Sequence, residues 1–374
     1  MDFFGICFVM EIRFARVGVA LGVPAQAMLP QEVFFVTNYK RTGVLFYGLF
    51  VFWCVLIGRA QGALDRSPLS VSNRFPMHFI FLSPRPVSAQ LPAEGTITGE
   101  LALDYSSVYF DRQSDTYAFL MDMEALVAEL SLTYSLTERL GLRLHVPMVS
   151  MNSGFLDGFL ESYHDALGVS NYGRENRPHD NFAYRLTKGR ETWVDGSTGE
   201  FGWTDITVSV QWGLFRAGQG RCWQSSLLAS AKAPTGDPEF GYGSGRWDFA
   251  LFMPNQWSFQ RWTLHLMPGL IYHDDPETLG AEVSAQNSYS LFGGAAYHYN
   301  ERWTWLAQLN YFSSPIEDTG VSRIDDGALE LALGFRRILA RNWHLAFAFC
   351  EDPFTLAAPD FTVHMGLSWA PSTK

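Results

Sequence analysis

The chain has 374 residues, of which 15% are aromatic and only 17% charged, and it contains 33 glycines and 12 tryptophans. This composition favours an all-β protein with many turns, and a mean hydropathy of −0.01 is too low for a helical membrane protein. The formal net charge of −11 argues against a nucleic-acid partner, because phosphate binding needs a basic surface.

The N-terminal region has the order of a secretory signal. The basic pair Lys40 and Arg41 precedes an apolar run over 43–58, and the small-residue stretch AQGA follows. The apolar run is shorter than the roughly 20 residues that a membrane-spanning helix needs. The sequence therefore predicts a signal peptide over 1–62, with a retained anchor as the alternative. A signal normally starts close to its basic pair, so the residues before Lys40 are interpreted as an extension from a mis-called start.

A period-two alternation begins in the stretch TITGELALDYS, after a segment over 63–95 that we interpret as a periplasmic lead-in. Leu101 and Leu103 fall on one face of this stretch, and Glu100 and Asp104 fall on the other. The same pattern returns in about twelve segments of roughly 10 residues, which is the length that a tilted membrane-spanning strand needs.

The connections between these segments separate a membrane barrel from a soluble sandwich. Connections after even-numbered segments are short, such as TERLG at Thr137, whereas those after odd-numbered segments are usually longer, such as 150–203. Short turns at one end and long loops at the other are typical of outer-membrane barrels. The sequence therefore predicts a transmembrane up-and-down antiparallel β-barrel of about 12 strands over 96–369, with a tail over 370–374. A secreted sandwich is the alternative.

The stretch GFLDGFLESYHDALG predicts one short amphipathic helix over 154–167, inside the long external loop 150–203. Its apolar side chains recur at helical spacing, and three carboxylates form a row at i, i+4 and i+8. The residues assigned to this helix and to the barrel mouth are Phe155, Asp157, Phe159, Glu161, Tyr163, His164, Asp165, Arg174 and Arg177.

This helix has three places to cover its apolar face: the barrel mouth, the rim, or the outer leaflet of the membrane. We expect the mouth, with the aromatic side chains as anchors and the acidic row toward the lumen. The alternative is a loop-stabilising helix whose carboxylates meet nearby arginines, of which Arg174 and Arg177 are the closest in sequence. Glu161 and His164 form half of a metal-carboxylate motif, and without a second pair they predict no metal.

The polar face of the strands is expected to line the lumen. Both signs of charge occur there, and buried charges must be paired or hydrated. Two interpretations stay open: a network of ion pairs that braces the barrel, and a wet passage lined with charge. The lumen-lining candidates are Glu100, Asp104, Glu129, Arg143, His145, Asp205, Lys232, Asp248, His298, Glu330, Arg336 and His364.

Several longer stretches resemble one protein family. RSPLSVSNRFP, ELALDYSSVYF, the helix stretch with GRENRP after it, GWTDITVSVQW, KAPTGDPEFGYGSGRWDFAL and EDPFTLAAPDFTVHMGLSW are similar to the outer-membrane β-barrel family catalogued as domain of unknown function 3187. The resemblance covers 67–369. It implies the location and the fold, and it implies no reaction.

These patterns predict an outer-membrane β-barrel of a Gram-negative bacterium that passively passes or binds a small solute and is gated by the 150–203 loop. The alternatives are a structural envelope barrel and a lipid-modifying outer-membrane enzyme. No catalytic residue is predicted, because GYGSG around Ser244 lacks the strand-to-helix turn of a nucleophile elbow. We expect no cofactor, and the expected partners are outer-membrane lipid, lipopolysaccharide and the barrel assembly machinery.

Overall fold

A computed structural model describes residues 66–371, except 169–170, 172, 200, 219–220, 278–283, 341 and 353–357. The predicted signal peptide over 1–62 lies outside the described residues. Within the described ranges, no helix is long and apolar enough to cross a membrane.

The described chain is mostly strand. Its helices are α2 (Met77–Ile80), α3 (Asp157–Leu167) and α4 (Ser322–Asp325), with one 3-10 turn, η1 (Arg174–Asn176). The strands are β1 (Ile97–Gln113), β2 (Tyr117–Ser135), β3 (Leu140–Asn152), β4 (Ala183–Lys188), β5 (Glu191–Asp195), β6 (Phe201–Trp203), β7 (Thr207–Ala217), β8 (Arg221–Lys232), β9 (Asp248–Phe252), β10 (Asn255–Phe259), β11 (Trp262–His273), β12 (Ser288–His298), β13 (Trp303–Phe312), β14 (Ala328–Ala340), β15 (Trp343–Glu351) and β16 (Phe361–Trp369).

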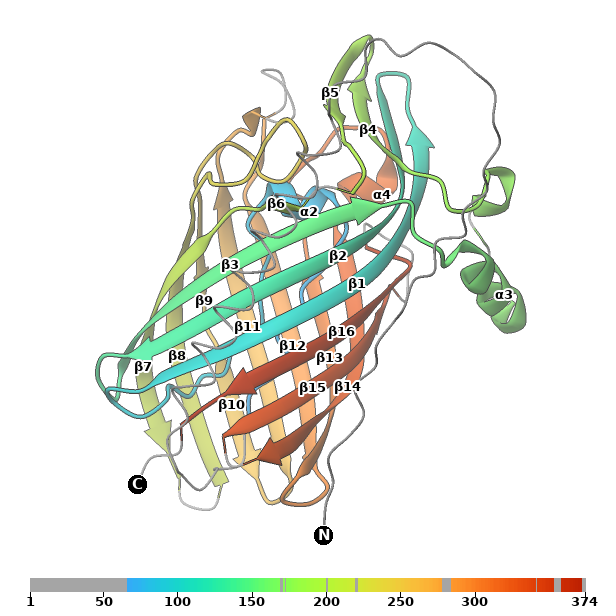
Figure 1. Cartoon of the computed structure of the whole chain (residues 1–374). Coiled ribbons are helices and arrows are strands. Elements are labelled where there is room, and N and C mark those ends of the chain that lie inside the picture. Colours follow the sequence, from blue (N-terminus) through green and yellow to red (C-terminus); the bar gives the residue numbers. More distant parts are fainter. Residues whose placement is uncertain are drawn as a thin grey trace, which may run out of the picture. The chain divides into compact units, whose positions relative to one another are not determined.

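These strands close into a barrel (Figure 1). Each wall strand pairs antiparallel with its neighbours, and β1 pairs with both β2 and β16, so the described wall has no free edge. β6 and β7 both pair with β3 and act as two segments of one strand, and β9 and β10 do the same between β8 and β11. The wall therefore contains 12 strands, and the predicted fold class is confirmed.

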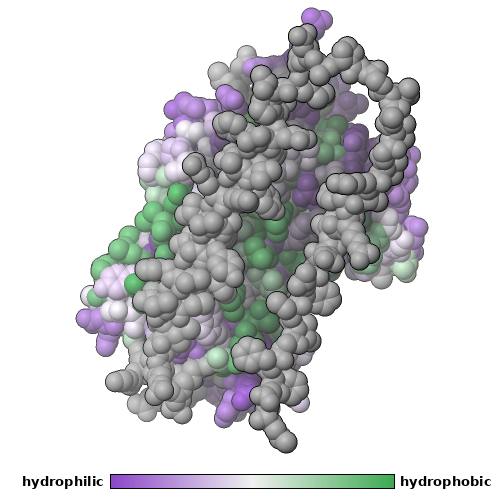
Figure 2. Space-filling model, viewed as in Figure 1, coloured by the Kyte–Doolittle hydropathy of each residue, from purple (hydrophilic) through white to green (hydrophobic). Residues whose placement is uncertain are grey.

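The alternation of side chains explains why these segments form a wall with two different faces. Along β11 every second residue is exposed on the outside, including Leu264, Leu266 and Leu270, and the residues between them, such as Thr263, are buried inside. Apolar residues gather over the middle of the visible face, and hydrophilic ones lie toward its ends (Figure 2). An apolar band between two polar ends is the surface expected of a barrel in a bilayer.

Residues 66–94 run inside the barrel, and we call them the interior segment. The prediction that 63–95 is a lead-in outside the barrel was therefore wrong for the described part of that range. The segment contains α2, which lies within the ring of strands in Figure 1. Leu69, Phe75 and Ile80 are all 0% exposed. The wall covers these side chains, which would face water in a periplasmic lead-in.

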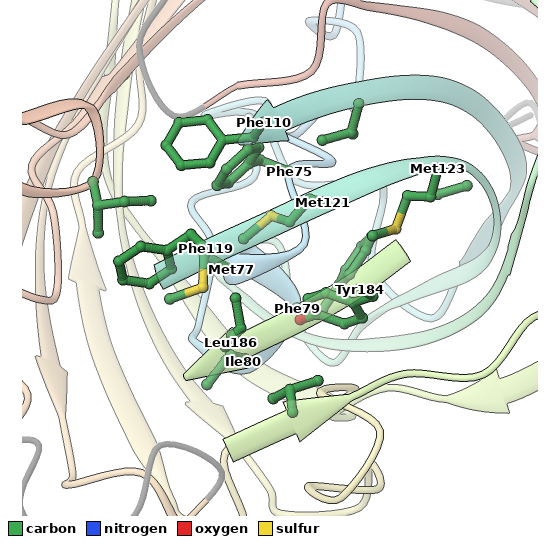
Figure 3. Close-up of a cluster of buried hydrophobic side chains, with 14 of the residues drawn as sticks. Phe75, Met77, Phe79, Ile80, Phe110, Phe119, Met121, Met123, Tyr184 and Leu186 are labelled. Atoms are coloured by element: carbon green, nitrogen blue, oxygen red, sulfur yellow. The ribbon is translucent and has the colours of Figure 1, made fainter. Parts of the chain in front are cut away.

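An apolar cluster fills the long-loop end of the barrel, where the 153–200 and 233–247 connections lie (Figure 3). Phe75, Met77, Phe79 and Ile80 of the interior segment meet side chains of β1, β2 and β4, including Phe110, Phe119, Met121, Met123, Tyr184 and Leu186. β4 pairs with the extension of β2 above the wall, which places Tyr184 and Leu186 over α2. The β4–β5 part of the long loop therefore covers the mouth.

The helix α3 lies outside the wall, beside the ends of β1 and β16 (Figure 1). Phe155, just before α3, stacks on Tyr105 with 5.9 Å between ring centroids. Asp104 points inward and is 0% exposed, so its neighbour Tyr105 points outward. The expectation that this helix docks in the mouth was wrong, because the mouth is already filled by the interior segment and β4.

The outward face gives a test of the membrane orientation. Leu309, in the middle of β13, is 46% exposed on the outside. Leu309→Arg should lower the free energy of unfolding by about 2–4 kcal/mol, because a charge at the bilayer midplane loses its hydration. Tyr299→Arg, in the turn after β12, should cost no more than about 1 kcal/mol. Urea unfolding in liposomes, followed by tryptophan fluorescence, measures both. Equal costs would mean that the band does not face lipid.

Candidate functional site

The interior of the barrel holds a network of buried charges that joins the interior segment to the wall. The Arg74 guanidinium bonds to the Asp104 carboxylate on β1, and its Nη2 atom lies 2.7 Å from Oε2 of Glu129 on β2. His364 Nδ1 on β16 lies 2.5 Å from the other oxygen of Asp104. Each of these side chains is 5% exposed or less, so one arginine of the interior segment links β1 and β2, and through Asp104 it reaches β16.

A second arginine of the interior segment reaches the same carboxylate. Arg85 bonds to Glu129, and its guanidinium lies 3.0 Å from Nε2 of His145 on β3. Arg85 also donates to the backbone carbonyl of Ser70 at 3.0 Å, while the Ser70 hydroxyl donates to Glu100 on β1. The two halves of the interior segment, before and after α2, are therefore tied to each other and to the first three wall strands.

Further round the wall, at β8 and β9, the cation belongs to a wall strand, and its acceptors belong both to the wall and to the interior segment. Lys232 Nζ on β8 lies 2.5 Å from Oδ2 of Asp205 and donates to the backbone carbonyl of Ile80 at 3.1 Å. Asp248 on β9 accepts the backbone N–H of Leu82 at 2.7 Å. The C-terminal end of α2 is therefore bonded to β8 and β9 by charged side chains.

Neutral and cationic side chains of the wall bond to the backbone near both ends of the interior segment. Gln308 on β13 accepts the N–H of Leu69 at 2.6 Å and donates to the carbonyl of the same residue at 3.2 Å. Arg336 donates to the carbonyls of Ser67 and Pro68 at 2.7 and 2.9 Å. Gln211 donates to the carbonyl of Ser88 at 2.8 Å. These bonds satisfy backbone groups that are buried away from water.

The space left around this network is small. A void of about 60 Å³ lies between Arg74, Glu129, His145 and Lys232. That volume holds a few water molecules and is too small for an organic solute. Together with the apolar cluster at the long-loop end, the interior segment therefore fills much of the middle of the barrel in the described part of the chain.

The structure places the predicted lumen residues on the inner face of the wall. Glu100, Arg143 and His145 are half-buried, and the other predicted residues are buried: Asp104, Glu129, Asp205, Lys232, Asp248, His298, Glu330, Arg336 and His364. His298 contacts Thr263 and Thr304 at 2.9 and 3.0 Å. Most of the others contact the interior segment or residues that contact it, and Glu100, Arg143 and Arg336 also line a cavity at the short-turn end.

The sequence reasoning missed Arg74 and Arg85, because it placed their segment outside the barrel. The composition of the predicted lumen residues already indicated that further cations must lie inside the barrel. Six of those residues are carboxylates and only three are Lys or Arg, and such an excess of buried negative charge requires further cations. Arg74 and Arg85, which precede the first strand, were two of the unassigned arginines.

Around α3, the acidic row does not face the lumen. Asp157 is 5% exposed and bonds to Arg174, which also bonds to Asp360 before β16. Burial raises the pKa of the Asp360 carboxyl, although the adjacent guanidinium opposes this shift. Glu161 lies 3.0 Å from His179, and Asp165 accepts from Asn171 at 3.2 Å. The carboxylates of the row therefore have separate partners, and Asp157 is the one that joins the helix to the wall.

The remaining residues assigned to the helix have different surroundings from those expected. Phe155 and Phe159 are 70% and 61% exposed, so they are not anchors packed against protein. Tyr163 donates to Glu351 at the end of β15 at 3.1 Å. His164 Nδ1 lies 3.0 Å from the Asn171 side-chain oxygen. Arg177 pairs with Asp122 on β2 at 2.8 Å instead of with the helix.

One constellation inside the wall has the order of a hydrolytic triad. His273 Nε2 on β11 lies 2.7 Å from the Ser288 hydroxyl on β12, and its Nδ1 lies 3.3 Å from Oδ2 of Asp248 on β9. A serine, a histidine and a carboxylate in this order can make the serine nucleophilic. Phe81 of the interior segment packs edge-on against His273 at 5.0 Å. All three groups are 5% exposed or less, so a substrate reaches them only if the interior segment moves.

Comparison with known proteins identifies the family of this chain and a solved structure with a similar fold. A model of the family described as "Protein of unknown function (DUF3187)" matches residues 46–370. No curated protein matches the chain. The COG4313 outer membrane channel from Pseudomonas putida F1 has a similar structure, with a TM-score of 0.52 and 14% identity over 75% of this chain and 97% of that chain.

Two other solved structures are similar at lower scores. The Pseudomonas putida toluene transporter TodX has a TM-score of 0.35 and 11% identity over 75% of this chain and 91% of that chain. An active-site mutant of outer membrane phospholipase A from Escherichia coli has a TM-score of 0.35 and 10% identity over 75% of this chain and 92% of that chain. These two structures add nothing to the fold assignment, which rests on the 12-strand wall and on the likeness to the COG4313 channel.

The contacts of α3 predict which changes loosen the long loop. Asp157→Asn should weaken the buried contact with Arg174 and cost about 1–3 kcal/mol locally, because the guanidinium keeps Asp360 as a partner. Phe159→Ala removes an exposed ring and should cost about 0.5 kcal/mol or less. Limited proteolysis within 153–200 should therefore be faster for Asp157→Asn than for Phe159→Ala. Asp165→Asn, on the exposed end of the same row, is the matched control and should behave like the wild type. Faster cutting in Phe159→Ala would show that the aromatic face is the anchor.

Proposed function

The chain belongs to the family described as protein of unknown function DUF3187. We propose that it is an outer-membrane barrel that passes or binds a small solute. In this proposal its own residues 66–94 close the barrel at rest. This proposal rests on one observation: two buried carboxylates belong to the wall, and the cations that pair with them belong mainly to the interior segment. Asp104 and Glu129 on the wall are neutralised mainly by Arg74 and Arg85, which belong to the interior segment.

The chemistry of this contact suits a segment that can leave. A permanent filling of the barrel would be cheaper with apolar side chains, because buried ion pairs lose much of their Coulomb energy to desolvation. Charged side chains, by contrast, can be hydrated both on the wall and on the interior segment once the two separate. A wall freed of the interior segment would carry carboxylates and amides toward the lumen, and such groups line aqueous pores.

The gate has two parts in this proposal. The interior segment fills the middle of the barrel, and the β4–β5 hairpin of the 150–203 loop covers the mouth through Tyr184 and Leu186, which are 1% and 0% exposed. The helix α3 of the same loop lies outside and does not block the lumen. Loop gating, as inferred from the sequence, is thus assigned to the β4–β5 hairpin.

The location and the partners are part of the same proposal. A cleaved signal over 1–62 would deliver the chain to the outer membrane of a Gram-negative bacterium. There the apolar band would contact lipid and lipopolysaccharide after insertion by the barrel assembly machinery. The apolar outer face and the exposed Phe155 and Phe159 beside it support contact with lipid.

A charge reversal tests the closed state. Arg74→Glu places a third carboxylate beside Asp104 and Glu129, and the mutual repulsion should expel the interior segment. In planar bilayers the wild type should carry no steady current, whereas Arg74→Glu should show current steps. Arg185→Glu is the control, because Arg185 is 58% exposed in a hairpin pair with Asp195. If both variants keep the heat-modifiable gel shift and neither conducts, the structural alternative replaces a passage.

A second candidate function is hydrolysis, favoured by the Ser288–His273–Asp248 arrangement. The buried position of Ser288 predicts that a fluorophosphonate probe does not label the wild type in detergent. In Arg74→Glu, where the interior segment should leave, the passage proposal again predicts no labelling, because it assigns these contacts to an ion-pairing network, whereas a hydrolase predicts labelling of the uncovered Ser288. Labelling of either protein that disappears in Ser288→Ala would contradict the passage proposal and favour an enzyme. Ser258→Ala, another buried inward serine, is the matched control.

A further inference from the structure

A larger cavity, of about 710 Å³, lies at the short-turn end of the barrel. Its walls come from the beginning of β1, the turn between β2 and β3, the ends of β7 and β14, and both ends of the interior segment. This cavity is separate from the 60 Å³ void, and only Arg85 lines both. Its volume falls in the range of about 300–1,000 Å³ that is typical of small-molecule sites.

The charge of this cavity is opposite to that of the whole chain. The chain carries a formal net charge of −11, yet the cavity lining includes two glutamates, Glu100 and Glu138, against six arginines: Arg66, Arg85, Arg139, Arg143, Arg216 and Arg336. A concave surface lined by one sign of charge concentrates ligands of the opposite sign.

Three of these arginines have no carboxylate in direct contact, although Glu100 acts on Arg143 at longer range. In the described part of the chain, Arg139, Arg143 and Arg216 take part in no ion pair, and Arg143 donates to the neutral amide oxygen of Gln211 at 2.8 Å. They come from β2–β3, β3 and β7, so they approach the cavity from neighbouring strands. Their positive charge is available to a ligand.

We propose that this cavity binds a small organic anion that carries two or more carboxylate or phosphate groups. Guanidinium groups match both oxyanions because their planar N–H donors form paired hydrogen bonds. Several arginines around one cavity favour a multiply charged ligand over a singly charged one. Ser131, Thr133 and Gln224 also line the cavity and supply neutral hydrogen-bonding groups for hydroxyls. The inference names the solute class for the proposed passage and in that respect rests on it.

Calorimetric titration of the purified full-length protein in neutral detergent at low salt tests this site. The probes are citrate, a tricarboxylate, and inorganic pyrophosphate, with sorbitol as a neutral probe. Either anion should bind the wild type with a measurable heat, whereas sorbitol should not. Arg139→Gln combined with Arg216→Gln should weaken anion binding at least tenfold. Both side chains are exposed, so the barrel should still fold, which the heat-modifiable gel shift checks.

Two further variants make the result specific. Arg143→Gln alone should also weaken binding, since Arg143 lies between the other two strands. Arg185→Gln, in the β4–β5 hairpin at the opposite end of the barrel, should bind like the wild type. The inference is overturned if neither anion binds, if the double variant keeps wild-type affinity, or if Arg185→Gln loses as much as the double variant.

The outcome is independent of the conductance experiment. Anion binding by a protein whose Arg74→Glu variant carries no current would overturn the proposed passage and support the site. Current steps in that variant, without anion binding by the wild type, would support the passage and overturn the site. A difference between citrate and pyrophosphate, when at least one binds, supports the site and identifies the favoured oxyanion.

Discussion

The structure depends on one constraint: carboxylates that point into the barrel need cations beside them. Asp104 and Glu129 are 0% and 1% exposed, and an unpaired charge at such a position costs several kcal/mol. Arg74 of the interior segment meets both. This contact holds the N-terminal segment inside the wall, and that placement removes the open lumen. It also leaves α2 and the β4–β5 hairpin to seal the long-loop end with apolar side chains. The long-loop helix α3 has no room in the mouth as a consequence.

The two ends of the barrel differ in chemistry because the interior segment is itself asymmetric. Around α2 it carries Phe75, Phe79 and Ile80, and the wall there contributes matching apolar residues. At the short-turn end its extended parts place Arg66 beside a cavity of about 710 Å³ that is lined by arginines. A solute arriving from the short-turn end would meet charge first and a closed apolar cluster last. The proposed passage therefore needs both the interior segment and the hairpin to move.

The wall could be predicted from the sequence because its signals are local and repeated. Period-two alternation identified the strands. Short turns at one end and long loops at the other identified a membrane barrel. The polar face of each strand then had to point inward, which gave the inward position of residues such as Lys232 and His364. The interior segment has no such period, because its side chains contact the wall on all sides and follow no strand face.

The position of the helix α3 was predicted wrongly for another physical reason. Its aromatic face can be covered by protein or by lipid, and in the structure Leu160 and Asp157 are buried while Phe159 is exposed. Sequence alone does not distinguish these environments.

The central claim is that residues 66–94 lie inside the folded barrel, held by the wall. Hydrogen–deuterium exchange of the purified protein in micelles measures this directly. The amides of Leu69 and Leu82 donate to Gln308 and Asp248, so peptides over 69–88 should exchange slowly, at rates close to those of the wall strands. Exchange of these peptides at the rate of an unstructured chain, with the strands still protected, would contradict the account.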